Sequence, residues 1–278
     1  MSFLNSANVN ANIKSDGVVY RKITIGKTPV SVKLENGKLN LAITNAVLYQ
    51  GTGTINISAD SANAFEMNAA FKGVQAEPLL SDAAITDKFS GAADLDLNFN
   101  SHGHSQKEII SALAGNGSFK INNGELKGVN LGDMLHNVQS AFGVAGNDAS
   151  AKTVFTALNG TFTATAGVIT NKDLTANTSG VNVAGQGDVN LPAYTISYRL
   201  TPQVVTSAKD ATGKATQKQG LAVPVVIEGS LDNPKYRPDV GSVLQNALSN
   251  PSQFKDQLKN SKGALGTTNL KGLLNGLR

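Results

Sequence analysis

The chain has 278 residues, of which 40% are apolar and 16% charged, with a formal net charge of +4 and no cysteine. It is too apolar for a disordered chain and too poor in charge for a coiled coil, and without cysteine it has no disulfide, no thiolate metal site and no cysteine nucleophile. The small positive excess is spread along the chain and few aromatic residues accompany it, so we expect no nucleic-acid partner.

Alternation of apolar and polar residues begins near the N-terminus and predicts antiparallel strands with one wet face. In the segment 38–58 the apolar positions of one expected face are Leu39, Leu41, Ile43, Val47, Tyr49, Ile55 and Ile57. FEMNAAF at 65–71 and LDLNF at 95–99 continue the pattern, and it places Asp94 and Asp96 on the wet face. The turn sequences SDG at 15–17, ENG at 35–37 and NNG at 122–124 predict hairpins, because Asn, Asp and Gly tolerate positive φ.

Helical periodicity interrupts the strands at a few places. VQAEPLLSD near Val74 predicts one or two helical turns. A helix is expected over Ser105–Ala114, because Ser105 and Glu108 form a capping box. Another is expected over Leu131–Phe142, where apolar residues recur at helical spacing.

The second half returns to strands after a linker-like segment, GVAGNDASAK at 143–152. GQGDVN is interpreted as a bend or bulge, because a strand and not a helix follows it. A polar loop is expected over Ser207–Gly220 and helix over Val240–Asn260, with Asn250 as a cap and Pro251 in the first turn. We therefore divide the chain into a β-rich domain over 1–239, with a candidate internal break near 143–153, and a helical tail over 240–278.

Candidate chemistry is sparse. His102 and His104 form an H-G-H pair that could begin a metal site, but exposed loop histidines explain it better, and His136 lies in another element. No serine-hydrolase, phosphate-loop or dinucleotide motif is present. Basic residues such as Lys255 and Lys259 in the tail suit either a membrane-surface helix or, as we favour, a helix packed over the end of the sheet. We expect no catalytic residue, no metal and no cofactor, and hence no enzyme.

Several segments in order resemble one family. GSFKINNGELKGVNLGDML at 117–135 resembles the C-terminal region of the AsmA family of Gram-negative envelope proteins. NAVLYQGTGTINIS at 45–58, TVFTALNGTFTATAGVITNKDL at 153–174, GQGDVNLPAYTISYRLTP at 185–202 and VPVVIEGSLDNPKYRPD at 223–239 extend the resemblance. Asn190 stands where the family usually has Asp, and Ser230 where Thr is common.

This resemblance implies a bridge-like lipid-transfer protein. Its antiparallel sheet would curl into an open apolar groove, with a few short helices capping or plugging it. The residues expected to line the groove are the seven of the 38–58 stripe together with Phe119, Ile121 and Phe162. Phospholipid would be the cargo, carried toward the outer membrane. The protein would lie on the periplasmic side of the inner membrane, held there by an N-terminal helix that this chain lacks, and other envelope proteins are candidate partners.

Two alternatives stay open. From the pattern alone, a filled sandwich or barrel core would produce the same alternation. A rival function is a structural or interaction module that assists outer-membrane protein assembly without carrying lipid.

Overall fold

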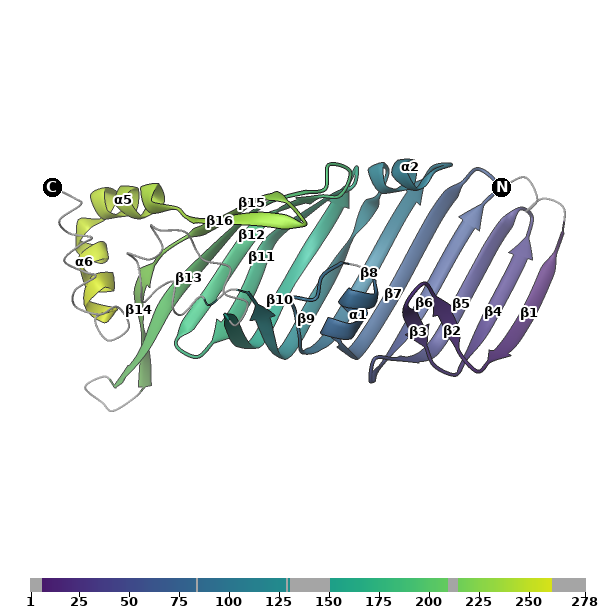
Figure 1. The fold of residues 1–278 in the computed structure, drawn as a ribbon, viewed down its shortest axis with the longest axis horizontal. Helices are drawn as coiled ribbons and strands as arrows, with labels where there is room; N and C mark the ends of the chain where they lie inside the picture. Colours follow the sequence, from purple (N-terminus) through teal and green to yellow (C-terminus); the bar gives the residue numbers. More distant parts are fainter. Residues whose placement is uncertain (1–6, 84, 129, 131–150, 210–214, 262–278) are drawn as a thin grey trace.

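The structure is a computed structural model that describes residues 7–261 except 84, 129, 131–150 and 210–214. Within these residues the chain forms one 14-stranded antiparallel sheet and a separate two-stranded hairpin (Figure 1). The strands are β1 Val9–Ser15, β2 Val18–Tyr20, β3 Ile23–Ile25, β4 Thr28–Glu35, β5 Lys38–Leu48, β6 Gly51–Asp60, β7 Ala64–Gln75, β8 Ala92–His102, β9 Ala114–Lys127, β10 Lys152–Thr165, β11 Val168–Thr178, β12 Val181–Asn190, β13 Thr195–Lys209, β14 Ala215–Ala222, β15 Val225–Ser230 and β16 Asn233–Pro238.

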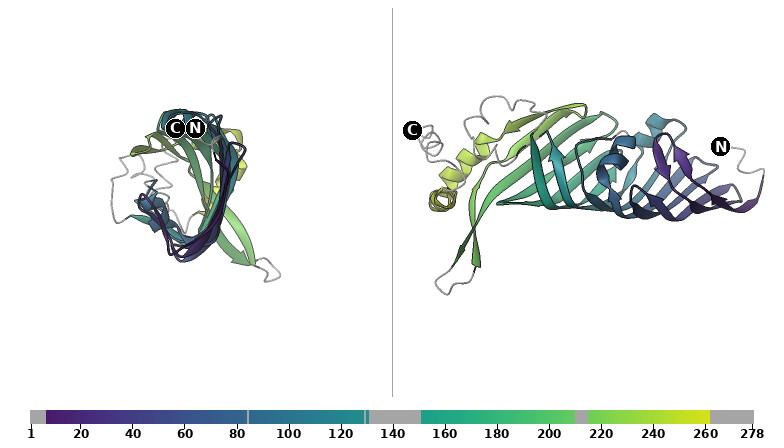
Figure 2. Two further views of the ribbon diagram at one scale, coloured as in Figure 1. Left: turned by 90° about the vertical axis from the view of Figure 1, so that its right-hand side faces the viewer. Right: turned by 60° about the horizontal axis from the view of Figure 1, so that its bottom comes forward.

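The sheet is a meander that does not close. Its order is β1-β4-β5-β6-β7-β8-β9-β10-β11-β12-β13-β15-β16, with β14 paired to β13 and the β2–β3 hairpin standing apart. The strands on either side of the 143–153 segment, β9 and β10, pair directly with each other. Seen from its end, the sheet curls into a trough (Figure 2), which confirms the expected fold class.

The described helices are short. α1 spans Ala76–Asp82, α2 Gln106–Ser111, α5 Val240–Ser249 and α6 Pro251–Asn260. The N-cap of α2 is as expected, because the Ser105 hydroxyl accepts a hydrogen bond from the Glu108 N–H at 3.2 Å. Pro251 opens α6, but the Asn250 side chain makes no capping hydrogen bond. The expected helix at Leu131–Phe142 lies outside the described residues.

Three predictions about turns meet different outcomes. ENG is a hairpin turn between β4 and β5, with Asn36 and Gly37 both at positive φ. SDG turns the chain out of β1, but into the separate hairpin, since β1 pairs with β4. NNG is not a hairpin turn and lies inside β9. Its Gly124 is needed for close packing, because a Cβ there would lie 2.1 Å from the Ser90 carbonyl oxygen.

The prediction of a polar loop over Ser207–Gly220 is wrong for the described residues of that segment, and residues 210–214 lie outside them. β13 and β14 extend into it and pair from Gln203–Ala222 to Lys209–Ala215. Small polar residues have low strand propensity, so the sequence contains only weak evidence of these strands.

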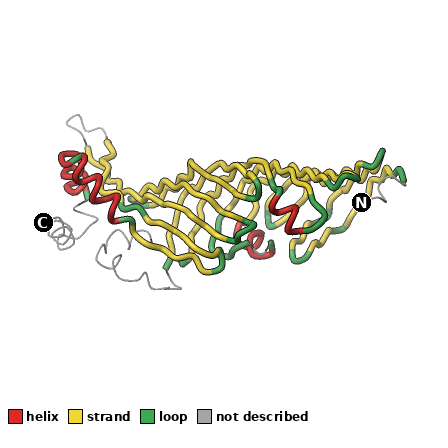
Figure 3. The backbone as a smooth tube through the Cα atoms, turned by 90° about the horizontal axis from the view of Figure 1, so that it is seen from above, coloured by secondary structure: helices red, strands yellow, loops and turns green. Residues whose placement is uncertain are grey.

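Apolar side chains gather in three clusters that follow one another along the sheet. The N-terminal cluster consists of Ile25, Val30, Ile43, Ala46, Leu48, Ala69, Phe71 and Val74. The central cluster consists of Ala76, Ala93, Ile121, Phe155, Leu158, Ala176, Val183 and Leu200. The C-terminal cluster consists of Val204, Leu221, Val223, Val243, Phe254 and Leu258. In the last cluster α5 and α6 pack on β13 and β14 at one end of the sheet (Figure 3), as favoured for the tail.

Candidate functional site

The register of the sheet aligns apolar side chains into rows that cross many strands. Directly paired residues of an antiparallel ladder point to the same face. One row runs through Val32, Leu41, Ile57, Met67 and Phe99. The next row runs through Val30, Ile43, Ile55, Ala69 and Leu97. We call this face of the sheet, from β4 to β13, the apolar face.

The apolar face continues through the central strands. There the pairing joins Ile121, Leu158, Ala176, Val183 and Pro202. Val181 packs against both the central and the C-terminal cluster, so the apolar surface is continuous with the region under α5 and α6.

The β2–β3 hairpin and α1 cover part of this face. Ile25 and Val18 of the hairpin and Leu79 of α1 all pack in or against the N-terminal cluster. Beside them Ile43 is only 6% exposed. In the first row, by contrast, Leu41, Met67 and Phe99 are half-buried and Ile57 is 39% exposed. The face is therefore buried under its covers and accessible along the row of Ile57.

The structure brings most of the predicted lining residues together. Leu41, Ile43, Tyr49 and Ile55 belong to or pack against the N-terminal cluster. Leu39 and Ile57 share their face through pairing with neighbouring strands. Farther along, Ile121 is buried in the central cluster, Phe119 packs against it, and Phe162 stacks on Phe99 with ring centroids 5.9 Å apart.

Val47 does not share this face. β5 and β6 shift register between Ile43 and Ala46, and Asn45 there has a φ of 53°. A bulge of this kind inserts residues on one strand and so turns later side chains to the opposite side. Ala46 and Leu48 therefore enter the N-terminal cluster, whereas Val47 is 53% exposed.

Glycines opposite aromatic rings are a feature of the apolar face that the sequence analysis missed. Gly53 pairs with Phe71, Gly117 with Phe162 and Gly160 with Phe119. An added Cβ at these glycines would lie 2.5, 2.4 and 2.8 Å from the opposing ring. Each aromatic ring therefore lies against a glycine of the adjacent strand. No second side chain projects into the trough at that position. The sequence does contain a signal for these pairs, because the glycines lie inside alternating segments, whereas a turn glycine would lie at the end of one.

A polar network crosses the apolar face between β10 and β13. Tyr198 donates its hydroxyl hydrogen to the Asn171 amide oxygen, and the Asn171 amide donates to the Thr161 carbonyl and to Asp173. Burial raises the pKa of Tyr198 well above its usual range, whereas hydrogen bonds from Thr161 lower the pKa of Asp173. Gly187 of β12 pairs with Asn171 of β11 on one side and with Tyr198 of β13 on the other. Because Gly187 has no side chain, the Tyr198 side chain can pass over β12 to contact Asn171. The bulge beside Asn171 lies opposite GQGDVN, where an irregularity was predicted.

Polar contacts hold α1 over the sheet. The Tyr49 hydroxyl donates to Asp82 at 2.7 Å, and the Lys127 ammonium lies 2.6 Å from the Glu77 carboxylate. Burial is the main cause that raises the pKa of Tyr49, and the hydrogen bond to Glu77 raises the pKa of Lys127.

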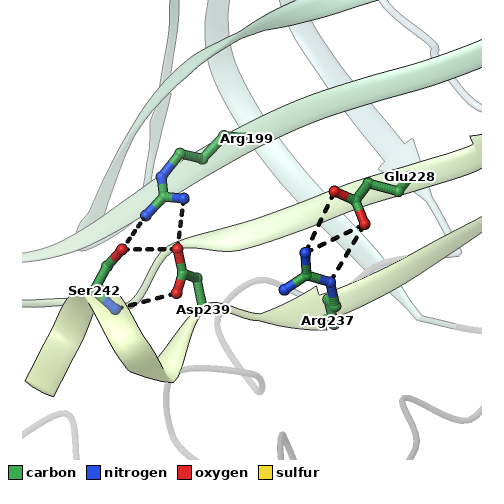
Figure 4. Close-up of polar contacts among 5 residues, drawn as sticks. All are labelled: Arg199, Glu228, Arg237, Asp239 and Ser242. Atoms are coloured by element: carbon green, nitrogen blue, oxygen red, sulfur yellow. Dashed lines mark hydrogen bonds and ion pairs between the residues drawn. The ribbon is translucent and has the colours of Figure 1, made fainter.

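A second set of polar contacts fixes α5 (Figure 4). Asp239 caps α5 by accepting hydrogen bonds from the Ser242 N–H at 3.1 Å and the Ser242 hydroxyl at 2.7 Å. Arg199 of β13 lies 2.6 Å from the same carboxylate. Hydrogen bonds from Ser242, followed by that from Arg199, lower the pKa of Asp239 to about 2. Beside this cluster Arg237 pairs with Glu228 at 3.2 Å.

Two cavities lie chiefly on the polar side of the sheet. One, of about 500 Å³, is lined among others by Thr170, Asp188 and Arg199. The other, of about 230 Å³, is lined among others by Asn40 and Ser58. Most residues that line the two cavities are polar or charged, although the smaller cavity also includes Leu41 and Ile57, so neither is the continuous apolar site that the family resemblance implies.

The histidines and carboxylates considered earlier lie away from the apolar face. His102 is exposed, and His104 lies 3.1 Å from the Asn63 amide and 3.7 Å from Glu108. His136 lies outside the described residues. Asp94 accepts a hydrogen bond from the Gly73 N–H at 2.8 Å. No three His, Asp or Glu side chains come together as a metal site in the part of the chain that the structure describes.

The comparisons with known proteins identify a family. A family model with the description AsmA family matches residues 2–174. This covers the 45–58, 117–135 and 153–174 segments of the resemblance, but not those after residue 174. Neither a curated protein nor a solved structure matches the chain significantly. Of the helices that the structure describes, none has the length and apolar character needed to span a membrane.

Proposed function

Because the chain belongs to the AsmA family, which is associated with the bacterial envelope, we propose that it binds phospholipid along the apolar face. The acyl chains would lie on that face and the head group would stay in water. In this proposal the protein acts without a chemical step, on the periplasmic side of the inner membrane of a Gram-negative cell. It passes phospholipid toward the outer membrane and so supports the integrity of the envelope.

The observation that carries the proposal is the accessible row from Val32 to Phe99. It crosses five strands, which at a spacing of about 4.8 Å gives a path of about 19 Å. Half of a bilayer's hydrocarbon core is roughly 15 Å thick. The row is therefore long enough for one extended acyl chain.

The energetics favour such an occupant. Each methylene group removed from water contributes about 0.8 kcal/mol. A continuous apolar surface left partly open is uncommon on a protein that binds nothing, and such surfaces mark binding sites. The glycines under the rings of Phe71, Phe119 and Phe162 support the proposal, since each ring can lie against the backbone of the neighbouring strand and leave the space above it free.

The proposal is tested by placing a carboxylate in the accessible row. Ile57→Asp puts the charge where water still reaches it, so we expect the protein to stay folded. Lipid recovered from the purified protein by solvent extraction and identified by mass spectrometry should fall severalfold. Ile43→Asp is the contrasting variant, because Ile43 is buried and a charge there costs several kcal/mol, comparable to a total stability of about 5–15 kcal/mol.

Three results would contradict the proposal. Folded Ile57→Asp protein with an unchanged lipid content would show that this row does not hold the lipid. Wild-type protein that never contains lipid would favour the structural or interaction module. Outright unfolding of Ile57→Asp would show that the row is part of a filled core.

A further inference from the structure

The β2–β3 hairpin has a buried base and an exposed tip. At its base Ile25 is 7% exposed, and the Gly26 N–H donates to the Val47 carbonyl at 2.7 Å. At its tip Val19 and Tyr20 are each 68% exposed. The hairpin thus rests on the apolar face at one end and presents apolar side chains to solvent at the other.

Two cations stand next to these side chains. The Arg21 guanidinium carbon lies 5.8 Å from the centre of the Tyr20 ring, and Lys22 follows in the turn. Neither cation is in an ion pair with a described residue, although farther down the hairpin Lys27 pairs with Asp16 at 3.2 Å. The tip therefore carries two positive charges that nothing described in this chain neutralises.

The backbone of the turn does not by itself account for the arginine. Arg21 has a φ of 56°, a conformation uncommon for residues other than glycine and several times more frequent for asparagine. Among the other described residues with positive φ, this chain has asparagine at four positions, but it also has Tyr49, Gln50, Ala166 and Tyr194. The backbone conformation at position 21 therefore does not require a cation, and what distinguishes the tip is its exposed side chains and its two charges without a described ion-pair partner.

We propose that this tip binds the surface of an anionic lipid bilayer. Tyr side chains favour the membrane–water interface, where the ring meets acyl groups and the hydroxyl meets water. Val19 would enter the same layer, and Arg21 and Lys22 would contact lipid phosphates. Because the base of the hairpin packs beside the accessible row, the bilayer would be brought to the trough. The inference concerns docking only and does not require lipid to be carried in the trough.

The test is co-sedimentation of the whole chain with vesicles of phosphatidylcholine, with and without one third phosphatidylglycerol. We expect the protein to bind the anionic vesicles and to be released by salt. In the double variant Arg21→Asn with Lys22→Ser, affinity should fall roughly fivefold per charge removed. Val19→Thr with Tyr20→Thr should also weaken binding, without a change in charge.

A control matched in charge is available on the polar face. Lys120→Ser with Lys235→Ser also removes two positive charges, but from exposed positions on β9 and β16. The affinity of this control for anionic vesicles should stay within twofold of wild type. Ile57→Asp should still bind vesicles, which separates docking from lipid carriage. Equal binding by wild type and the Arg21–Lys22 variant would overturn the proposal. So would an equal loss in the Lys120–Lys235 control, or wild-type binding that does not depend on phosphatidylglycerol.

Discussion

Asp239 shows how one carboxylate can join a helix to a sheet. It accepts hydrogen bonds from Ser242 and pairs with Arg199, and its side chain is only 21% exposed. A folded-state pKa of about 2 lies below the ordinary value of 3.8. The resulting stability is present above about pH 4 and is lost as pH falls through about 2, because the unfolded state binds the proton more tightly.

We predict that Asp239→Asn lowers the free energy of unfolding by about 1–2 kcal/mol at neutral pH, after allowance for partial exposure. The difference from wild type should shrink between pH 4 and pH 2, measured by urea denaturation at a series of pH values. Arg237→Gln is the control, since its pair with Glu228 is more exposed and should contribute less than about 1 kcal/mol. A difference that persists unchanged at pH 2 would show that the charge of Asp239 is not responsible.

The glycines under aromatic rings give a second prediction at the scale of single residues. Gly160→Ala would place a Cβ 2.8 Å from the Phe119 ring and 2.9 Å from the Asn171 amide nitrogen. Such overpacking costs about 1–3 kcal/mol, which denaturation should detect. Gly241→Ala in α5 should instead gain about 0.5–1 kcal/mol, because only Asp239 lies near, at 3.6 Å, and alanine favours helix. A stabilised Gly160→Ala would show that the ring moves away freely.

Among the elements, α1 depends on side chains that sequence patterns do not reveal. We predict that Tyr49→Phe, which removes the hydrogen bond to Asp82, destabilises the protein by about 1 kcal/mol. Hydrogen exchange should quicken chiefly at the Ala83 and Ile85 amides, which donate to carbonyls of α1. Tyr194→Phe removes a more exposed hydrogen bond to Asp232 and should change little. Unchanged exchange in Tyr49→Phe would show that Lys127 and packing suffice to hold α1.

The strands themselves were largely predictable, and so was the bulge opposite GQGDVN, but the bulges in β5 and β7 were not. Alternation identified the apolar residues of β5 to β9, because a period of two follows directly from strand geometry. The bulge in β5 leaves no such trace, so Val47 was placed on the wrong side of that strand. NNG has the composition of a turn, but it lies inside β9, whose register is regular there. The bridging side chains Asn171 and Tyr198 lie on different strands, and only the register brings them together. The face was therefore predictable in composition, but its polar network and glycine pairs were not.

At the scale of the whole molecule, most of the described strands of the meander pair only with the strands that precede and follow them in the sheet, so within this part of the chain the two ends of the sheet are joined only through the strands between them. The N-terminal cluster draws its residues from β3, β4, β5 and β7, and the C-terminal cluster from β13, β14, α5, α6 and Val223, which follows β14. No member belongs to both clusters, and the central cluster lies between them. Such an arrangement resembles a repeat protein, in which each unit is stabilised mainly by its neighbours.

We therefore predict that the two ends of the trough lose structure independently. Ile43→Ala and Leu221→Ala each remove a buried side chain and should cost about 2–5 kcal/mol locally. Hydrogen exchange followed by mass spectrometry should show faster exchange in β4–β7 for the first variant and in β13–β14 and α6 for the second. Each variant serves as the control for the other, because their effects lie at opposite ends of one sheet. If either substitution quickened exchange evenly from β4 to β16, the sheet would unfold as one cooperative unit and the segmental view would be wrong.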